Sequence, residues 1–185
     1  MRADRLQKEY EIQIRWVAFP LRTDTPEDGL SLKEIYAARN IDVDQAKKRF
    51  RQVADEIGLP LGEREKTYNS RPAQELAKWA EEKGKGDEFH KAIFRACFVD
   101  ARNIGKMDEL LRIVKSIDLP EKAAKQTLES GTFKKDVDTD WSRCHALGIT
   151  AVPTFVIDHQ AVVGFQPYET LEQLLRTKDI KKRTY

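Results

Sequence analysis

The spacing of apolar residues changes twice along the chain, and each change marks a different kind of element. Residues 11–19 alternate polar and apolar or run apolar, with β-branched and aromatic side chains, which predicts a strand. From Ser31 to about Leu128 the apolar positions follow helical spacing instead. Residues 154–158 and 161–164 are short apolar runs around a tight turn, which predicts an antiparallel hairpin.

The helical stretches carry recognisable start and stop signals. Ser31 begins Ser-Leu-Lys-Glu, the pattern of a capping box. Gly58 and Pro60 end one predicted helix, and Gly148 is placed to cap the C-terminus of another. The predicted helices cover residues 2–10, 31–38, 43–57, 71–80, 87–101, 107–117, 121–128, 132–147 and 168–176.

Charge and composition exclude several classes of partner. The chain has 33 basic and 31 acidic residues, interleaved, so no nucleic-acid or anionic-membrane surface is expected. No apolar stretch reaches the ~18–20 residues of a membrane span. The charged start, Met1-Arg-Ala-Asp, is unlike a signal peptide, so we expect a cytoplasmic protein. The basic segment from Lys178 to Arg183 predicts a frayed, solvated tail.

The two cysteines are too few for a disulfide framework. Cys97 shares an apolar helical stripe with Phe94 and Phe98, which favours a buried thiol. Cys144, in the helix before the proline loop, is the candidate for a reactive thiol. Its neighbour His145 points about 100° away around the helix and need not touch it. Two cysteines and three histidines show no metal-ligand spacing, so no metal site is expected.

Val152, Pro153 and Thr154 form the candidate substrate-binding site. A proline at the start of a strand cannot donate a ladder hydrogen bond and restricts the residue before it. Such a proline is often cis where it shapes a binding loop. One interpretation is that Pro153 only shapes the entry to the strand. The other is that the backbone of Val152 pairs with an extended substrate.

Several segments together resemble DsbA-like oxidoreductases, and the FrnE-like branch most of all. Residues 67–71, 74–80 and 94–104 resemble the helical insert of that family, and residues 16–21 resemble the end of its second strand. Val152-Pro-Thr-Phe-Val-Ile157 with Gly164-Phe-Gln-Pro167 resembles its cis-proline loop and last hairpin. The resemblance implies an α/β, thioredoxin-like fold with a large inserted helical domain. Residues 1–29 and 132–185 would form the thioredoxin-like domain, and residues 30–131 the insert.

The same resemblance implies thiol–disulfide exchange, without a cofactor, on thiol- or disulfide-containing proteins or small molecules. Family members place a first strand and a Cys-x-x-Cys ahead of the segment that begins here at Met1. This sequence contains no Cys-x-x-Cys, so no catalytic residue is carried over and we expect the chain to be inactive as written. The first strand would lie centrally, between residues 11–19 and 154–158. We therefore expect Met1 to be an internal methionine of a longer protein.

Two other functions remain open from the sequence. One is a glutathione-dependent enzyme, like the kappa-class transferases or 2-hydroxychromene-2-carboxylate isomerase, with glutathione as cofactor. Gly164-Phe-Gln-Pro167 resembles the oxidoreductase branch more, because the transferase group usually has Ser-Asp near position 166. The other is a non-catalytic, peptide-binding thioredoxin-like module. The sequence leaves open the substrate, the direction of exchange, and whether the protein is a monomer or a homodimer.

Overall fold

The computed structural model describes residues 2–184, and the chain divides into two compact units. Residues up to Leu21 and from Thr139 onward form one unit, here called the terminal unit. Arg22–Asp138 forms the other, here called the helical unit. The expected domain boundaries, at 29/30 and 131/132, stay a prediction.

Four amphipathic helices of the helical unit, those between residues 71 and 130, pack around one apolar core. The elements of this unit confirm the predicted helices to within a few residues: α2 (Leu32–Ala37), α3 (Val43–Glu56), α4 (Arg71–Glu82), α5 (Gly86–Phe98), α6 (Met107–Lys115) and α7 (Glu121–Ser130). The buried residues come mainly from α4, α5 and α6, where apolar side chains recur every three or four positions. They include Leu76, Trp79, Phe89, Leu110 and Val114.

Two very short strands in the helical unit were not expected from the sequence. β1 (Leu30–Ser31) pairs antiparallel with β2 (Lys66–Thr67). A two-residue strand is too short to show a period, so only its partner reveals it. Ser31 also caps α2, because its side chain accepts a hydrogen bond from the N–H of Glu34 at 3.5 Å.

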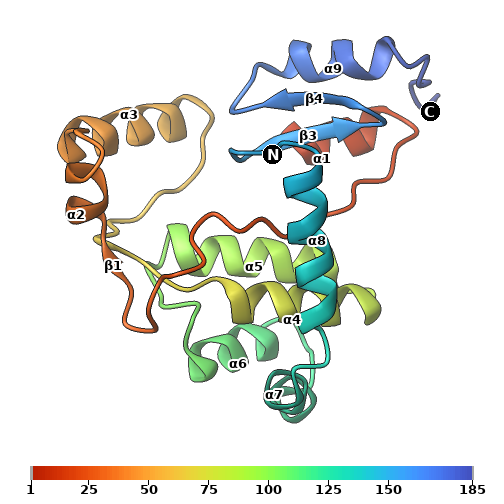
Figure 1. Cartoon of the computed structure of the whole chain (residues 1–185). Coiled ribbons are helices and arrows are strands. Elements are labelled where there is room, and N and C mark those ends of the chain that lie inside the picture. Colours follow the sequence, from red (N-terminus) through yellow and green to blue (C-terminus); the bar gives the residue numbers. More distant parts are fainter. Residues whose placement is uncertain (1, 185) are drawn as a thin grey trace. The chain divides into compact units, whose positions relative to one another are not determined.

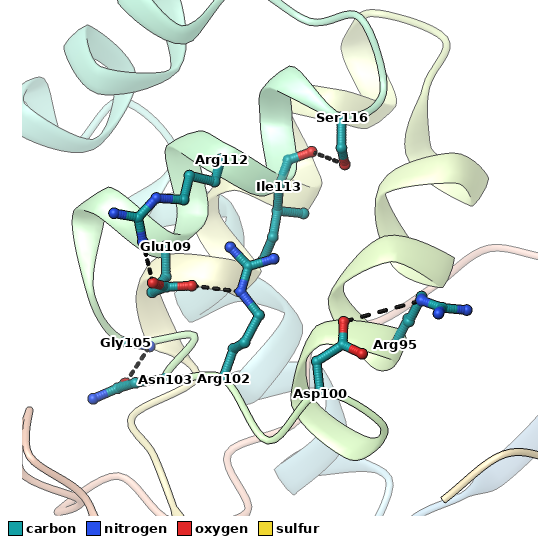
Figure 2. Close-up of polar contacts among 9 residues, drawn as sticks. All are labelled: Arg95, Asp100, Arg102, Asn103, Gly105, Glu109, Arg112, Ile113 and Ser116. Atoms are coloured by element: carbon teal, nitrogen blue, oxygen red, sulfur yellow. Dashed lines mark hydrogen bonds and ion pairs between the residues drawn. The ribbon is translucent and has the colours of Figure 1, made fainter. Parts of the chain in front are cut away.

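The loop between α5 and α6 is held by side-chain contacts as well as by backbone turns (Figure 2). Glu109 accepts from Arg102 Nε at 2.5 Å and also pairs with Arg112. Asn103 Oδ1 accepts from the N–H of Gly105 at 2.9 Å. These contacts hold the loop against the start of α6.

Among the described residues, the terminal unit contains a hairpin and three helices (Figure 1). β3 (Thr154–Ile157) pairs antiparallel with β4 (Gln160–Val163), in the register Thr154 to Val163 and Ile157 to Gln160. The helices are α1 (Arg2–Glu9), α9 (Tyr168–Arg176) and α8 (Lys134–Ala146), which begins in the helical unit. The core joins side chains of α1 and α9 to one face of the hairpin: Leu6, Tyr10, Tyr168, Leu171 and Leu175, with Phe155, Ile157 and Val162.

The predicted strand over residues 11–19 is wrong. Burial does alternate as in a strand, because the even-numbered residues from Ile12 to Ala18 are half-buried and the odd-numbered ones are exposed. However, these residues form no β-ladder within the described part of the chain, 2–184. Alternation sets which side chains face the core, but a strand also needs a neighbouring strand to complete its hydrogen bonds.

The predicted frayed tail is also wrong. The N–H of Glu11 donates to Lys181 O at 3.0 Å, and the N–H of Arg183 donates to Glu9 O at 2.8 Å. Lys182 Nζ lies 2.9 Å from Glu172 Oε1. The tail is ordered because its backbone satisfies polar groups at the end of α1, and its lysine pairs with a carboxylate on α9.

The stability of the terminal unit should depend on pH through Glu172. Its carboxylate accepts from the Tyr10 hydroxyl at 2.6 Å and pairs with Lys182, and these contacts lower the pKa of Glu172 from 4.5 to about 2. A folded-state pKa below the unfolded one gives stability that is present above pH 4.5 and is lost as the pH falls toward 2. Urea unfolding of Glu172→Gln should show a shallower loss of stability over this range. An unchanged pH dependence in the variant would contradict this assignment.

Candidate functional site

The candidate site is the loop that enters β3, where the structure places Val152, Pro153 and Thr154 together. The Val152–Pro153 peptide bond is cis. Pro153 O accepts from the N–H of Gly164 at 2.7 Å, and Thr154 Oγ1 donates to Ala151 O at 2.6 Å. The loop is therefore anchored to the end of β4 on one side and to its own preceding turn on the other.

Val152 is exposed, and its backbone polar groups have no internal hydrogen-bond partner among residues 2–184. The residue is 47% exposed. Within residues 2–184, neither its N–H nor its C=O takes part in a hydrogen bond. A backbone N–H or C=O with no internal partner can pair with the backbone of an extended peptide.

The other wall of the site is the segment that follows β4. Gly164 has φ +83°, a conformation that favours glycine, and it turns the chain after the strand. Gln166 Nε2 donates back to Val163 O at 2.8 Å. Phe165 remains 51% exposed. This places an aromatic ring beside the proline loop, because Gly164, the residue before Phe165, donates to Pro153.

Arg2 completes this wall, and sequence reasoning missed it. Its Nη1 donates to Gln166 O at 2.5 Å, and its Cζ lies 3.7 Å from the centre of the Phe165 ring. α1 thus begins at the end of the hairpin where β3 starts and β4 ends (Figure 1). Nothing in the local sequence around Arg2 indicates a partner more than 160 residues away.

Cys144, the candidate thiol, is poorly suited to nucleophilic attack. It is buried, and its Sγ donates to Ala18 O at 3.6 Å. Burial raises the pKa of the Cys144 thiol, and the nearby Asp140 carboxylate raises it further. Since exchange requires an exposed thiolate, this environment disfavours the reactive form.

Cys97 is buried in the helical unit, as predicted. Arg64 Nη1 lies 3.2 Å from its Sγ, yet burial dominates and raises the pKa of the thiol. Neither cysteine therefore offers the low-pKa, exposed thiolate of a redox centre.

Neither thiol should react with a labelling reagent while the chain is folded. We expect Ellman's reagent to modify neither cysteine at an appreciable rate at pH 8, and both on addition of guanidinium chloride. The variants Cys97→Ala and Cys144→Ala assign any signal to one residue. Fast labelling of Cys144 in the folded state would contradict its described burial.

Asp140 is a second residue that sequence reasoning missed. Its side chain is only 2% exposed, and its Oδ2 accepts from the N–H of Ala18 at 2.8 Å. Arg15 Nη2 lies 3.5 Å from its Oδ1. Together with Cys144, one turn further along α8, it holds both backbone polar groups of Ala18. Side chains of α8 thus replace part of the ladder that the segment 11–19 lacks.

Two further classes of site are absent from residues 2–184. No group of three or more histidine, cysteine or acidic side chains there could hold a metal ion. In the same range, no helix combines the length and apolar character needed to cross a membrane.

Known proteins with a similar sequence or a similar structure bear on the fold and the family of this chain. A curated relative, uncharacterized protein YwbO of Bacillus subtilis (strain 168), is 26% identical over 182 residues, covering 95% of this chain and 86% of that protein. A probable DsbA oxidoreductase from Streptomyces coelicolor has a similar structure, with a TM-score of 0.77, 23% identity, and coverage of 85% of this chain and 71% of that one. A 2-hydroxychromene-2-carboxylate isomerase has a TM-score of 0.74 and 18% identity, and the match covers 96% of this chain and 85% of the isomerase.

Likeness to these two solved structures supports a thioredoxin-like, DsbA-type fold for this chain. At such low identity, the likeness reports on the fold alone. The family is shown by a separate comparison. The model of the DSBA-like thioredoxin domain matches residues 1–176, nearly the whole sequence. The chain therefore belongs to the DSBA-like thioredoxin domain family.

Proposed function

We propose that the terminal unit is the substrate-contacting part of a thiol–disulfide oxidoreductase. The observation that carries this proposal is the loop at Val152–Pro153, whose exposed residue Val152 has no internal hydrogen bond among residues 2–184. An extended peptide can pair with this backbone and lie with its disulfide beside Pro153. Membership of a DsbA-like family supports a thiol or disulfide compound as the substrate.

The chemistry needs a dithiol that residues 1–185 do not supply. A thiolate attacks one sulfur of the substrate disulfide, so a mixed disulfide forms and the other substrate sulfur leaves as a thiolate that takes up a proton. The second thiol then displaces the remaining substrate sulfur, and the dithiol ends as a disulfide. Because Cys97 and Cys144 are buried, we propose that the attacking dithiol comes from another polypeptide segment. Residues 1–185 alone then catalyse no reduction of insulin.

A pair of labelled peptides tests the proposal. One carries a cysteine as its methyl disulfide, and the other carries serine at that position. We expect fluorescence anisotropy to show tighter binding of the disulfide peptide. Pro153→Ala should weaken this binding several-fold, since alanine adds an N–H and frees the backbone that proline restricts. Pro120→Ala, at an exposed position in the helical unit, is the control and should change nothing.

The outcomes separate this function from its alternatives. Equal binding of both peptides would contradict disulfide recognition and favour a non-catalytic peptide-binding module. If residues 1–185 alone catalyse a glutathione-dependent isomerisation or transfer, the function of the glutathione-dependent enzymes is favoured instead. A protein of this function with two free, buried thiols fits a reducing compartment, and we propose the cytoplasm.

A further inference from the structure

Two arginines of α1 stack on aromatic rings in the same way, but only one of them holds a carboxylate. The Cζ of Arg5 lies 3.7 Å from the centre of the Tyr168 ring, and its Nε donates to Glu9 Oε1 at 2.6 Å. The Cζ of Arg2 lies at the same distance, 3.7 Å, from the centre of the Phe165 ring. Arg2 and Arg5 are three residues apart, so both point from one side of α1.

Arg2 lacks the carboxylate that completes the pair at Arg5. Within the described residues, its hydrogen bond is to the carbonyl of Gln166 and it forms no ion pair. A guanidinium carries five N–H donors in a rigid fork, and this bond uses only Nη1. The stacking and the bond to Gln166 O fix the plane of the group, which lowers the entropy cost of binding a carboxylate with the remaining donors.

The position of Arg2 links this group to the candidate site. Its two contacts, Phe165 and Gln166, directly follow Gly164, whose N–H donates to Pro153 O. A ligand that lies on the loop at Val152 therefore passes close to the guanidinium.

We propose that Arg2 binds a carboxylate of the substrate, so that the site prefers anionic thiol or disulfide compounds over neutral ones. This inference rests on the proposed function, because it assigns the substrate class of the same site. A charge-assisted, forked contact of this kind favours a carboxylate over its neutral ester by roughly tenfold.

Glutathione and its diethyl ester are suitable probes, because they differ only in their carboxylates. Isothermal titration of the whole chain should show glutathione binding roughly tenfold more tightly than the diester. Arg2→Met keeps an apolar stem on Phe165 and should remove this preference, so that the affinity for glutathione falls far more than the affinity for the diester. Arg143→Met is the matched control, since it removes one exposed positive charge from α8 of the same unit and should keep the preference.

Other results would overturn the inference. If Arg2→Met lowers the affinity for both forms equally, Arg2 only supports the loop and selects nothing. If glutathione and its diester bind the parent chain equally, or if neither binds, Arg2 is not a carboxylate site. The disulfide-peptide titration is independent of these results. If the chain still binds the disulfide peptide more tightly, the proposed function stands without the role of Arg2. If it does not, both the proposed function and the role of Arg2 are contradicted.

Discussion

A Gly62→Ala protein is expected to unfold far more easily than the parent chain. A Cβ atom at position 62 would lie 1.8 Å from Val99 O and 2.8 Å from Val99 C, and both are backbone atoms that cannot rotate away. The N–H of Gly62 also donates to Phe98 O at 2.9 Å, which holds the two segments together. Relieving the clash must separate this loop from the end of α5, at a cost of about 3 kcal/mol.

Gly58→Ala provides the matched comparison within the same loop. Gly58 has φ +65°, but no atom lies within 4 Å of an added Cβ. The substitution should cost only the strain of the left-handed backbone, about 1 kcal/mol. Urea unfolding of both variants measures the difference. Equal destabilisation by the two substitutions would show that the loop does not pack on Val99 as described.

Asp140→Ala is expected to give the other large loss of stability. The change removes the buried acceptor of the Ala18 N–H and leaves Arg15 without its carboxylate. The half-buried N–H of Ala18 loses its acceptor and the exposed Arg15 loses its partner, which together cost about 2 kcal/mol. The segment before Leu21 should also become more open, because it has no ladder within residues 2–184 to retain it. Amide hydrogen exchange at Ala18 reports this opening directly.

Asp138→Ala is the control for Asp140, two residues away on the same helix. The Asp138 side chain is 61% exposed and pairs with Arg71 at 2.8 Å. A surface ion pair of this kind contributes at most about 1 kcal/mol. Similar losses in the two variants would contradict the structural role assigned to Asp140.

The helices and the hairpin could be predicted from the sequence because their signals are local. Helical spacing, the cap at Ser31 and the turn after Ile157 all lie within the element that they define. Residues 11–19 and the tail were predicted wrongly because their state depends on distant partners. The first carries a strand pattern but no ladder among residues 2–184, and the second finds its partners at Glu9 and Glu11.

Some residues of the candidate site could likewise be predicted from the sequence, and others could not. Val152 and Pro153 can be found from sequence, since a proline before a short apolar strand is a local and unusual pattern. Arg2 and Asp140 cannot, because their partners lie 164 and 122 positions away along the chain. An arginine near the start of a helix and an aspartate inside one are common at solvated surfaces, and only the folded chain shows what they contact.

The central claim is that the loop at Val152–Thr154 contacts a disulfide substrate. The most direct measurement is an amide NMR titration of the isotopically labelled chain with the methyl-disulfide peptide. We expect shift changes at Val152, Thr154 and Gly164–Gln166, with the helical unit unaffected. Changes confined to other parts of the chain, or no change at saturating peptide, would contradict the claim.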